Sequence, residues 1–135
     1  MPHFGTRSLE RLETVDPDLV AIFTELIRLV DVSILCGSRS EADQNAAVAS
    51  GNSRTPWPQS RHNCPEPGQL SRAVDWAPYP IDWNAADRFL LCGGLLWGIA
   101  EGLEVEVRLG SDWSRNGRAN GNGFEDLGHV ELWEP

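Results

Sequence analysis

Basic residues are scarce in this chain of 135 residues, which has 11 of them against 20 acidic residues and a formal net charge of -9. No window gathers the basic side chains into the patch that a nucleic-acid or anionic-membrane surface requires. We therefore expect no nucleic-acid partner.

Long apolar runs are also missing. The longest, residues 89–100, is interrupted by three glycines and is shorter than the ~20 residues needed to cross a bilayer. Residues 1–10 contain no apolar segment of the kind that secretory signals have. These absences predict a chain without a membrane span or a signal peptide, kept in the cytoplasm until something else releases it.

The three cysteines, Cys36, Cys64 and Cys92, are widely spaced and include no CxxC pair. Such a set argues against a disulfide framework or a four-cysteine zinc site, and we expect reduced thiols. With 41% hydrophobic residues, a chain of this length can bury one core. We therefore expect a single domain over residues 1–135.

The apolar pattern predicts an α+β domain with a small antiparallel sheet and packed helices. Helical spacing covers residues 16–30, 40–50 and 82–102, and alternation predicts strands over residues 31–36, 72–77, 104–109 and 128–133. Asp16 is the expected N-cap of the first helix. The third helix offers these side chains for burial: Trp83, Phe89, Leu90, Leu96, Trp97 and Ile99. Residues 52–69, with four prolines, and the Gly/Asn-rich residues 110–123 are expected loops.

Two histidines and one acid are candidate metal ligands. His3 lies near the chain terminus, where we expect it to be inert, which leaves His62 and His129. Together with Asp75 they would leave one tetrahedral position open, as catalytic zinc sites do. Spacing alone does not select this set, because the two histidines can be combined with any of 20 acids.

Three motifs follow one another along the chain: Ser60-Arg61-His62, Ala73-Val74-Asp75 and Asp126-Leu127-Gly128-His129-Val130-Glu131. With them the chain resembles the zinc peptidases that include bacterial D-Ala-D-Ala carboxypeptidases and the phage endolysins that cut the L-alanyl-D-glutamate bond of peptidoglycan. The segments Cys36-Gly37-Ser38-Arg39-Ser40 and Gly110-Ser111-Asp112-Trp113 resemble the phage branch. The resemblance covers nearly the whole chain and implies a hedgehog/D-Ala-D-Ala peptidase-like fold with the metal site at the sheet.

The resemblance also implies roles for individual residues. His62, Asp75 and His129 would hold Zn²⁺, and Asp126 would be the general base for the attacking water. Arg39 would bind a peptide carboxylate or polarise the scissile carbonyl. Judged from the residues alone, Asp126 could instead cap a turn, and Arg39 could form a surface ion pair.

Four further residues are candidates for supporting roles. Glu131 shares a strand face with His129 and either orients it or forms a structural salt bridge. Ser60 is expected to fix its loop by a hydrogen bond, because no histidine is free to activate it as a nucleophile. Gln44 and Trp113 are further substrate-side candidates, Trp113 because it lies in a loop that could line a cleft.

Two features depart from the family pattern. The spacer of residues 63–72 is longer than usual and lacks the usual glycine before the Ala-x-Asp motif. A loop insertion costs little closure entropy, so we still expect the ligands to converge. Cys64, two residues after His62, is an additional candidate soft ligand.

Residues 112–117 match the D-x-[DNS]-x-[DN]-G spacing of calcium loops through Asp112, Ser114 and Asn116. Further oxygen donors would be Asn120, Asn122 and Glu125. The segment has a single carboxylate and no glutamate at the twelfth position, so any Ca²⁺ binding should be weak. We favour a flexible Gly/Asn turn.

Together these features predict a monomeric, zinc-dependent phage endolysin that acts on the peptidoglycan stem peptide and has no separate wall-binding domain. It would wait in the host cytoplasm until a holin opens the membrane. One alternative is a D-Ala-D-Ala carboxypeptidase or dipeptidase of the same fold. Another is a non-catalytic, zinc-bearing wall-binding or virion protein, which would have no need of a carboxylate at Asp126.

Overall fold

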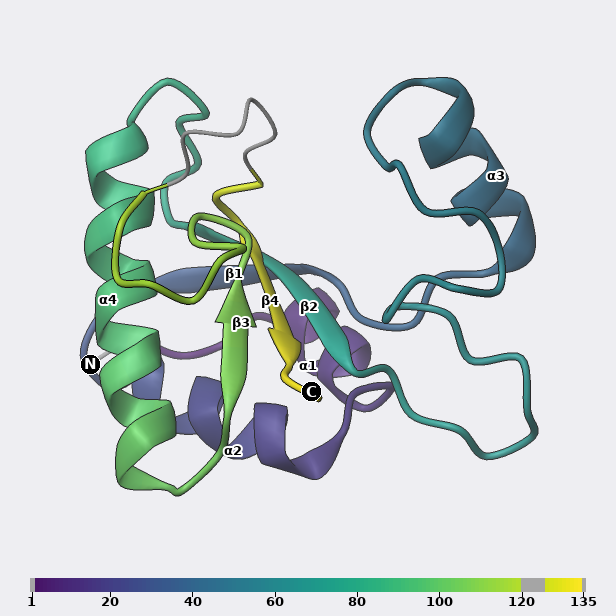
Figure 1. Ribbon diagram of the computed structural model, residues 1–135. Coiled ribbons are helices and arrows are strands. Elements are labelled where there is room, and N and C mark those ends of the chain that lie inside the picture. Colours follow the sequence, from purple (N-terminus) through teal and green to yellow (C-terminus); the bar gives the residue numbers. More distant parts are fainter. Residues whose placement is uncertain (1, 120–125, 135) are drawn as a thin grey trace.

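The computed structural model describes residues 2–119 and 126–134. Its elements are α1 (Thr6–Leu12), α2 (Pro17–Leu26), β1 (Val32–Cys36), α3 (Glu41–Ala49), β2 (Ala73–Pro78), α4 (Ala86–Gly102), β3 (Val107–Leu109) and β4 (His129–Leu132). The strands pair antiparallel in the order β1-β2-β4-β3 (Figure 1). The expected α+β class and antiparallel sheet are confirmed.

Two helices begin at side-chain caps. The carboxylate of Asp16 accepts a hydrogen bond from the backbone N–H of Asp18 at 2.9 Å, and Pro17 occupies the first helical position of α2. The hydroxyl of Ser40 accepts from the N–H of Asp43 at 3.2 Å at the start of α3. Both caps satisfy backbone N–H donors that the first turn of a helix leaves free. The sequence pattern therefore predicts each of these two helix starts to within one residue of its position in the structure.

Helix α1 was not expected from the sequence. It has seven residues, its N-cap Gly5 offers no side chain, and only Ser8 and Leu12 are buried, so its pattern is weak. Its role is tertiary. The hydroxyl of Ser8 accepts from the N–H of Ile34 at 3.0 Å, and Arg11 donates to the carbonyl of Ile34 at 2.8 Å. Helix α1 thereby covers part of the free edge of β1.

Helix α4 begins at Ala86, four residues later than expected. The carboxylate of Asp82 accepts from the N–H of Asn84 at 3.0 Å and closes a turn before the helix. Trp83 lies in this turn and is 65% exposed, so its expected burial was wrong. Leu90 and Trp97 are also exposed, whereas Phe89 and Leu96 are buried as expected.

Strand β3 is shorter than expected because α4 ends in a helical stop signal. Glu104 adopts a φ of 59°, the left-handed conformation that often follows a helix, and the N–H of Val105 donates to the carbonyl of Ala100 at 2.9 Å. The chain therefore reaches extended pairing only at Val107.

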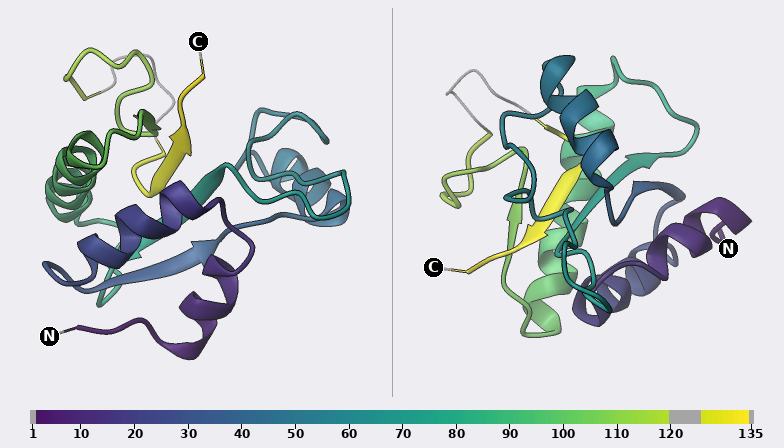
Figure 2. Two further views of the ribbon diagram at one scale, coloured as in Figure 1. Left: turned by 90° about the horizontal axis from the view of Figure 1, so that it is seen from below. Right: turned by 90° about the vertical axis from the view of Figure 1, so that its right-hand side faces the viewer.

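The hydrophobic core lies between one face of the sheet and helices α2 and α4. Helix α3 stands apart from α1 and α2 in both views of Figure 2. The loop that follows α3 returns to the connection between α1 and α2, where Ser71 pairs with Val15. Within residues 2–119 and 126–134, no helix is long and apolar enough to span a membrane. The sheet face opposite the core remains available for polar chemistry.

Gly128 sits where β4 meets the centre of the sheet. A Cβ there would press against the carbonyl oxygen of Trp76 and approach Phe89 Cε1 to 3.3 Å. We expect Gly128→Ala to lower the free energy of unfolding by about 1–3 kcal/mol, measured by urea denaturation. The matched control is Gly98→Ala inside α4, where a Cβ meets nothing within 4 Å, and it should stabilise the protein by about 0.5–1 kcal/mol. Equal effects of the two variants would contradict this packing.

Candidate metal centre and active site

Strand register places three potential ligands in one row. Cys36 of β1 lies opposite Asp75 of β2, and Asp75 lies opposite His129 of β4. The β1–β2 register shifts between Ile34 and Cys36. Such a bulge re-aims side chains, and here Cys36 lines the cleft on the side of Asp75 although Ile34 is in the core.

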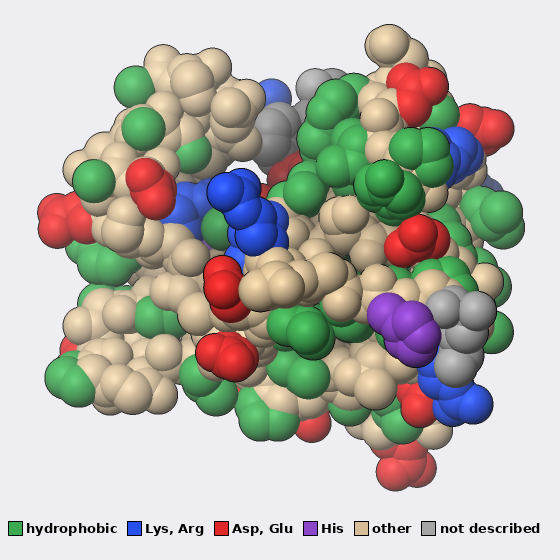
Figure 3. Space-filling view, turned by 180° about the vertical axis from the view of Figure 1, so that it is seen from behind, with side chains coloured by type: hydrophobic (Ala, Val, Ile, Leu, Met, Phe, Trp, Pro, Cys, Tyr) green, Lys and Arg blue, Asp and Glu red, His purple; other side chains and the backbone are tan. Residues whose placement is uncertain are grey.

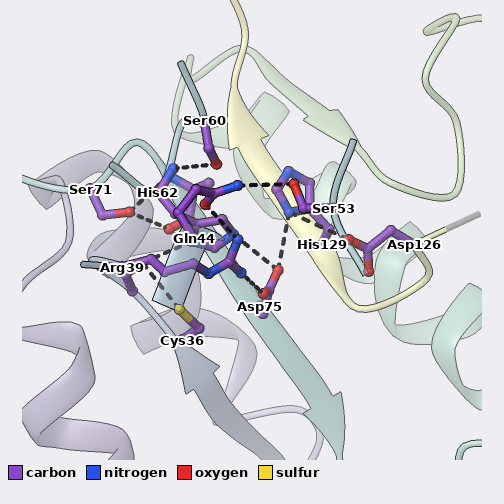
Figure 4. Close-up of polar contacts among 12 residues, drawn as sticks. Cys36, Arg39, Gln44, Ser53, Ser60, His62, Ser71, Asp75, Asp126 and His129 are labelled. Carbon is purple, nitrogen blue, oxygen red and sulfur yellow. Dashed lines mark hydrogen bonds and ion pairs between the residues drawn. The ribbon is translucent and has the colours of Figure 1, made fainter. Parts of the chain in front are cut away.

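The structure brings together the three residues expected to bind zinc (Figure 4). Asp75 Oδ1 lies 3.1 Å from His62 Nε2 and 3.1 Å from His129 Nδ1. Both histidines are buried. Ligand atoms around a tetrahedral zinc ion lie about 3.3 Å apart, since Zn–N and Zn–O bonds are about 2.0–2.1 Å long. Each of these two distances fits such a centre. The two histidines share no group of potential ligand atoms that all lie within 4.8 Å of one another, so their nitrogens lie farther apart than the ligands of one tetrahedral ion.

Each imidazole is also held through its second nitrogen. His62 Nδ1 lies 2.8 Å from the carbonyl oxygen of Gly37, and His129 Nε2 lies 2.9 Å from Glu131 Oε1. Partners of this kind fix the ring orientation and the tautomer of metal-binding histidines. The arrangement therefore aims one nitrogen of each ring at Asp75.

The electrostatics of the cluster favour protonated imidazoles around an ionised carboxylate. Burial lowers the pKa of His62, but its hydrogen bonds with Asp75 and Cys36 outweigh burial and raise the pKa to about 10. Burial lowers the pKa of His129 as well, but the hydrogen bonds with Asp75 and Glu131 outweigh burial and raise that pKa. Burial raises the pKa of Asp75, but the two histidines outweigh it and hold that pKa well below its usual range. Metal ligation requires neutral imidazoles, so binding of a cation here would release protons.

Potential ligand atoms among the described residues form two groups that share Asp75. One contains Cys36 and His62, and the other contains Asp126 and His129. The sequence did not single out Cys36, because its approach to Asp75 depends on the irregular strand pairing. Cys64, the cysteine considered from the sequence, is in neither group, and its thiol points at the carbonyl of His62 at 3.8 Å.

Asp126 lies at the edge of the cluster with its side chain toward His129 (Figure 4). Its Oδ2 is 3.9 Å from His129 Nδ1, and the side chain is 38% exposed. The adjoining turn uses the backbone of Asp126, whose carbonyl accepts from the N–H of His129 at 3.1 Å. Burial, with the charge of Asp75 adding to it, raises the pKa of Asp126 despite the opposing effect of His129. This carboxyl can exchange a proton with a group in the cleft.

Arg39 lines the cleft and forms an ion pair with Asp75, a candidate ligand. Its Nη2 donates to Asp75 Oδ2 at 2.9 Å, and its Nη1 donates to Gln44 Oε1 at 3.1 Å. The side chain is only 16% exposed, so this ion pair is internal and not a surface pair. The guanidinium holds Asp75 Oδ2, which leaves Oδ1 facing the two histidines.

Gln44 connects α3 to the rest of the site. Its Oε1 also accepts from Asn63 Nδ2 at 3.1 Å, and its Nε2 donates to Ser53 Oγ at 3.0 Å and to the carbonyl of Thr55 at 2.6 Å. Gln44 is fully buried, so these bonds replace water. It positions Arg39 and is not among the residues that line the cleft.

The other supporting residues are placed as follows. Ser60 Oγ accepts from the N–H of His62 at 3.2 Å and fixes the loop. Glu131 combines both suggested roles, because it holds His129 and also accepts from Arg108 Nη2 at 2.9 Å. Burial raises the pKa of Glu131, but His129 and Arg108 outweigh it and lower that pKa. The ring centroid of Trp113 lies 5.3 Å from that of His129, and Trp113 lines the cleft.

The segment considered for calcium forms a turn. Asp112 Oδ1 accepts from the N–H of Asn116 at 3.1 Å, and Asp112 Oδ2 accepts from the N–H of Gly117 at 2.7 Å. Asn120, Asn122 and Glu125 lie outside the described residues. Both oxygens of its one carboxylate thus serve the turn, in line with the favoured interpretation.

A cleft of about 840 Å³ exposes the cluster. Its lining comes from β1, from α3 and the loop after it, from the β2–α4 segment, and from the residues around β4. His62, Asp75, Asp126 and His129 all line it. An extended substrate can therefore reach the candidate ligands and the neighbouring acid together.

Comparisons with known proteins identify the family of this chain. The sequence pattern of a family described as phage L-alanyl-D-glutamate peptidase matches residues 1–133. Among solved structures, the Serratia marcescens L-Ala D-Glu endopeptidase ChiX is 28% identical, with a TM-score of 0.74 over 97% of this chain and 90% of that chain. A comparison with curated proteins found no match. Because the family pattern spans nearly every residue, the chain belongs to the phage L-alanyl-D-glutamate peptidase family.

Proposed function

We propose that this chain is a zinc-dependent endopeptidase that hydrolyses the L-alanyl-D-glutamate bond of the peptidoglycan stem peptide and thereby lyses bacterial cell walls. The observation that carries the proposal is the convergence of His62 Nε2 and His129 Nδ1 on Asp75 Oδ1 inside an accessible cleft. Family membership and the likeness to an L-Ala D-Glu endopeptidase support the reaction and the bond.

Two nitrogens and one carboxylate oxygen form a donor set that suits catalytic zinc, with a fourth position left for water or substrate. His62, Asp75 and His129 would hold the ion, which when bound polarises a carbonyl and lowers the pKa of water. The partners Gly37, Glu131 and Arg39 keep the three ligands in place. Cys36, beside His62 and Asp75, is a further soft donor at this centre.

Asp126 acts as the general base and acid. Its carboxylate takes a proton from the attacking water and passes that proton to the departing amine of D-glutamate. Its distance of 3.9 Å from His129 Nδ1 keeps it beside the ligands without a hydrogen bond to them. Burial raises the pKa of this carboxyl group in the metal-free protein, which favours its acting as a base.

Two other functions compete with this proposal. A carboxypeptidase or dipeptidase needs a site closed at one end to hold a terminal carboxylate. Here the residues that line the cleft include Arg54, after α3, and Trp83, before α4. A cleft with walls on both sides of the candidate ligands favours cleavage within a peptide chain. A non-catalytic binding protein would have no use for the carboxylate of Asp126 beside the candidate ligands.

Domain organisation, oligomeric state and location in the cell follow from the same proposed function. We propose that residues 1–135 form one catalytic domain that acts as a monomer. The substrate lies in the cell wall, so we propose that the protein stays in the host cytoplasm until a holin opens the membrane. Family membership supports this route.

The test is release of new amino termini from purified peptidoglycan. We expect wild-type protein to expose N-terminal D-glutamate, and chelator treatment to abolish this release until zinc is restored. Release of free D-alanine instead would indicate a carboxypeptidase. Zinc binding without any cleavage would contradict the peptidase and favour the binding protein.

A further inference from the structure

An aromatic side chain stands exposed at the rim of the cleft. Trp83 is 65% exposed, yet its ring stacks on Phe89 at 5.6 Å between centroids with an interplanar angle of 20°. Phe89 is buried and lies 5.9 Å from Trp76 in the core. The indole of Trp83 therefore has a firm backing and one face open to solvent.

Trp83 belongs to the wall of the same cleft as Asp75 and Asp126. Tyr79 and Ile81, in the segment just before it, are also exposed. Figure 3 shows hydrophobic side chains gathered on this part of the surface, beside a hollow that separates it from the part carrying α3. An exposed apolar patch next to a site marks a place where a ligand is held.

The opposite wall has a different character. Arg54 and Arg61 line the cleft from the loop that follows α3. Helix α3 with its loop and the β2–α4 segment lie on opposite sides of the molecule in Figure 1. The cleft therefore carries arginines on the α3 side and an aromatic side chain on the Trp83 side. Arg61 also pairs with Glu131 at 3.7 Å and with Glu134 at 3.1 Å.

The substrate of the proposed function has the same polarity, and the inference rests on that function. In a stem peptide, the amine of L-alanine is joined through a lactyl group to a neutral sugar ring. The D-glutamate on the other side of the scissile bond carries a free α-carboxylate. Arginine suits the carboxylate, whereas the C–H face of a pyranose packs on the electron-rich face of an indole.

We propose that Trp83 is the platform for the muramyl sugar of the glycan strand, so that the enzyme recognises stem peptides still attached to glycan. The sugar stacks on the open face of the indole, and the D-glutamate side of the substrate lies toward the arginines. Trp83 then determines substrate specificity and takes no part in the chemistry at Asp75 and Asp126.

The test compares two substrates that differ only in the sugar: a muramyl tripeptide and the N-lactoyl tripeptide of L-alanine, D-glutamate and diaminopimelate. We expect Trp83→Ala to raise KM for the muramyl tripeptide about 2- to 10-fold with kcat unchanged, and to leave KM for the N-lactoyl tripeptide unchanged. The matched control is Trp97→Ala, since Trp97 is also exposed but does not line the cleft. It should behave as wild type.

Three results would overturn the assignment. An equal rise in KM for both substrates would mean that Trp83 contacts the peptide. An unchanged KM for both substrates would mean that Trp83 contacts neither the sugar nor the peptide. If wild-type protein cut neither substrate, the proposed function and the inference would fall together. Wild-type cleavage of both, with the variant selectively impaired on the muramyl tripeptide, supports the sugar platform.

Discussion

Replacing Asp126 with asparagine should lower kcat on peptidoglycan by about 10²- to 10⁴-fold, the usual contribution of a general acid–base group. Asparagine keeps the size of the side chain but accepts no proton from water. The backbone hydrogen bonds of Asp126 to Gly110 and His129 do not depend on the side chain, so the turn should persist. The measurement is the steady-state rate of amino-terminus release, with circular dichroism to verify folding.

Zinc content separates two roles for Asp126. It lies within ligand distance of Asp75 and His129, so it could hold the ion as well as act as a base. We expect Asp126→Asn to retain one zinc per chain, measured by atomic absorption after dialysis. Zinc loss in parallel with activity would make Asp126 a ligand and contradict its role as base. Asp87→Asn, at the start of α4 and outside the cleft, is the control and should match wild type.

The pH dependence follows from the same group. A general base works when it is deprotonated, so activity falls as pH drops through its pKa. Burial raises the pKa of Asp126 above its ordinary value in the metal-free protein. The positive charge of bound zinc opposes this rise, so the acid limb of kcat/KM reports the balance of the two effects. The pH profile of kcat/KM should be recorded while bound zinc is measured. A fall in activity that coincides with loss of zinc would not report the protonation of Asp126.

Asp75→Asn should have the largest effect on metal binding. The carboxylate contacts both histidines and Arg39, and the amide that replaces it has no charge and directs a donor toward one of those partners. Loss of a mere supporting partner of a ligand costs about 10- to 100-fold in affinity, so loss of this ligand should cost at least about 100-fold. Competition with a chromogenic chelator measures the affinity. Wild-type affinity in Asp75→Asn would contradict the proposed ligand set.

The same variant should change how the stability of the metal-free protein depends on pH. The lowered pKa of Asp75 contributes stability above its ordinary value of 3.8, and this contribution is lost as pH falls below it. The raised pKa of His62 contributes stability below 6.5, and this is lost as pH rises toward about 10. The metal-free wild type should therefore resist urea best between these limits. Asp75→Asn should weaken the dependence of stability on pH at both limits. The variant lacks the carboxyl group whose own pKa is lowered, and it also lacks the partner that raises the pKa of His62.

Local features of the sequence determined much of this protein. The caps Asp16 and Ser40 act within three residues, so two helix starts followed from the sequence. The motifs around His62, Asp75 and His129 are short and ordered, and their resemblance to a family was enough to suggest the reaction, the α+β fold and the ligand set. The long spacer after His62 did not prevent the ligands from meeting, because flexible loops tolerate added length.

Contacts between distant residues were decided only by the tertiary structure. The irregular pairing of β1 with β2 brought Cys36 to Asp75. Arg39 became the ion-pair partner of Asp75, and Gln44 of α3 holds Arg39 in that position. The exposure of Trp83 likewise depended on a turn before α4 and on stacking against Phe89. Hydrophobic periodicity specifies which residues can be buried, but strand register and long-range packing decide which of them are buried.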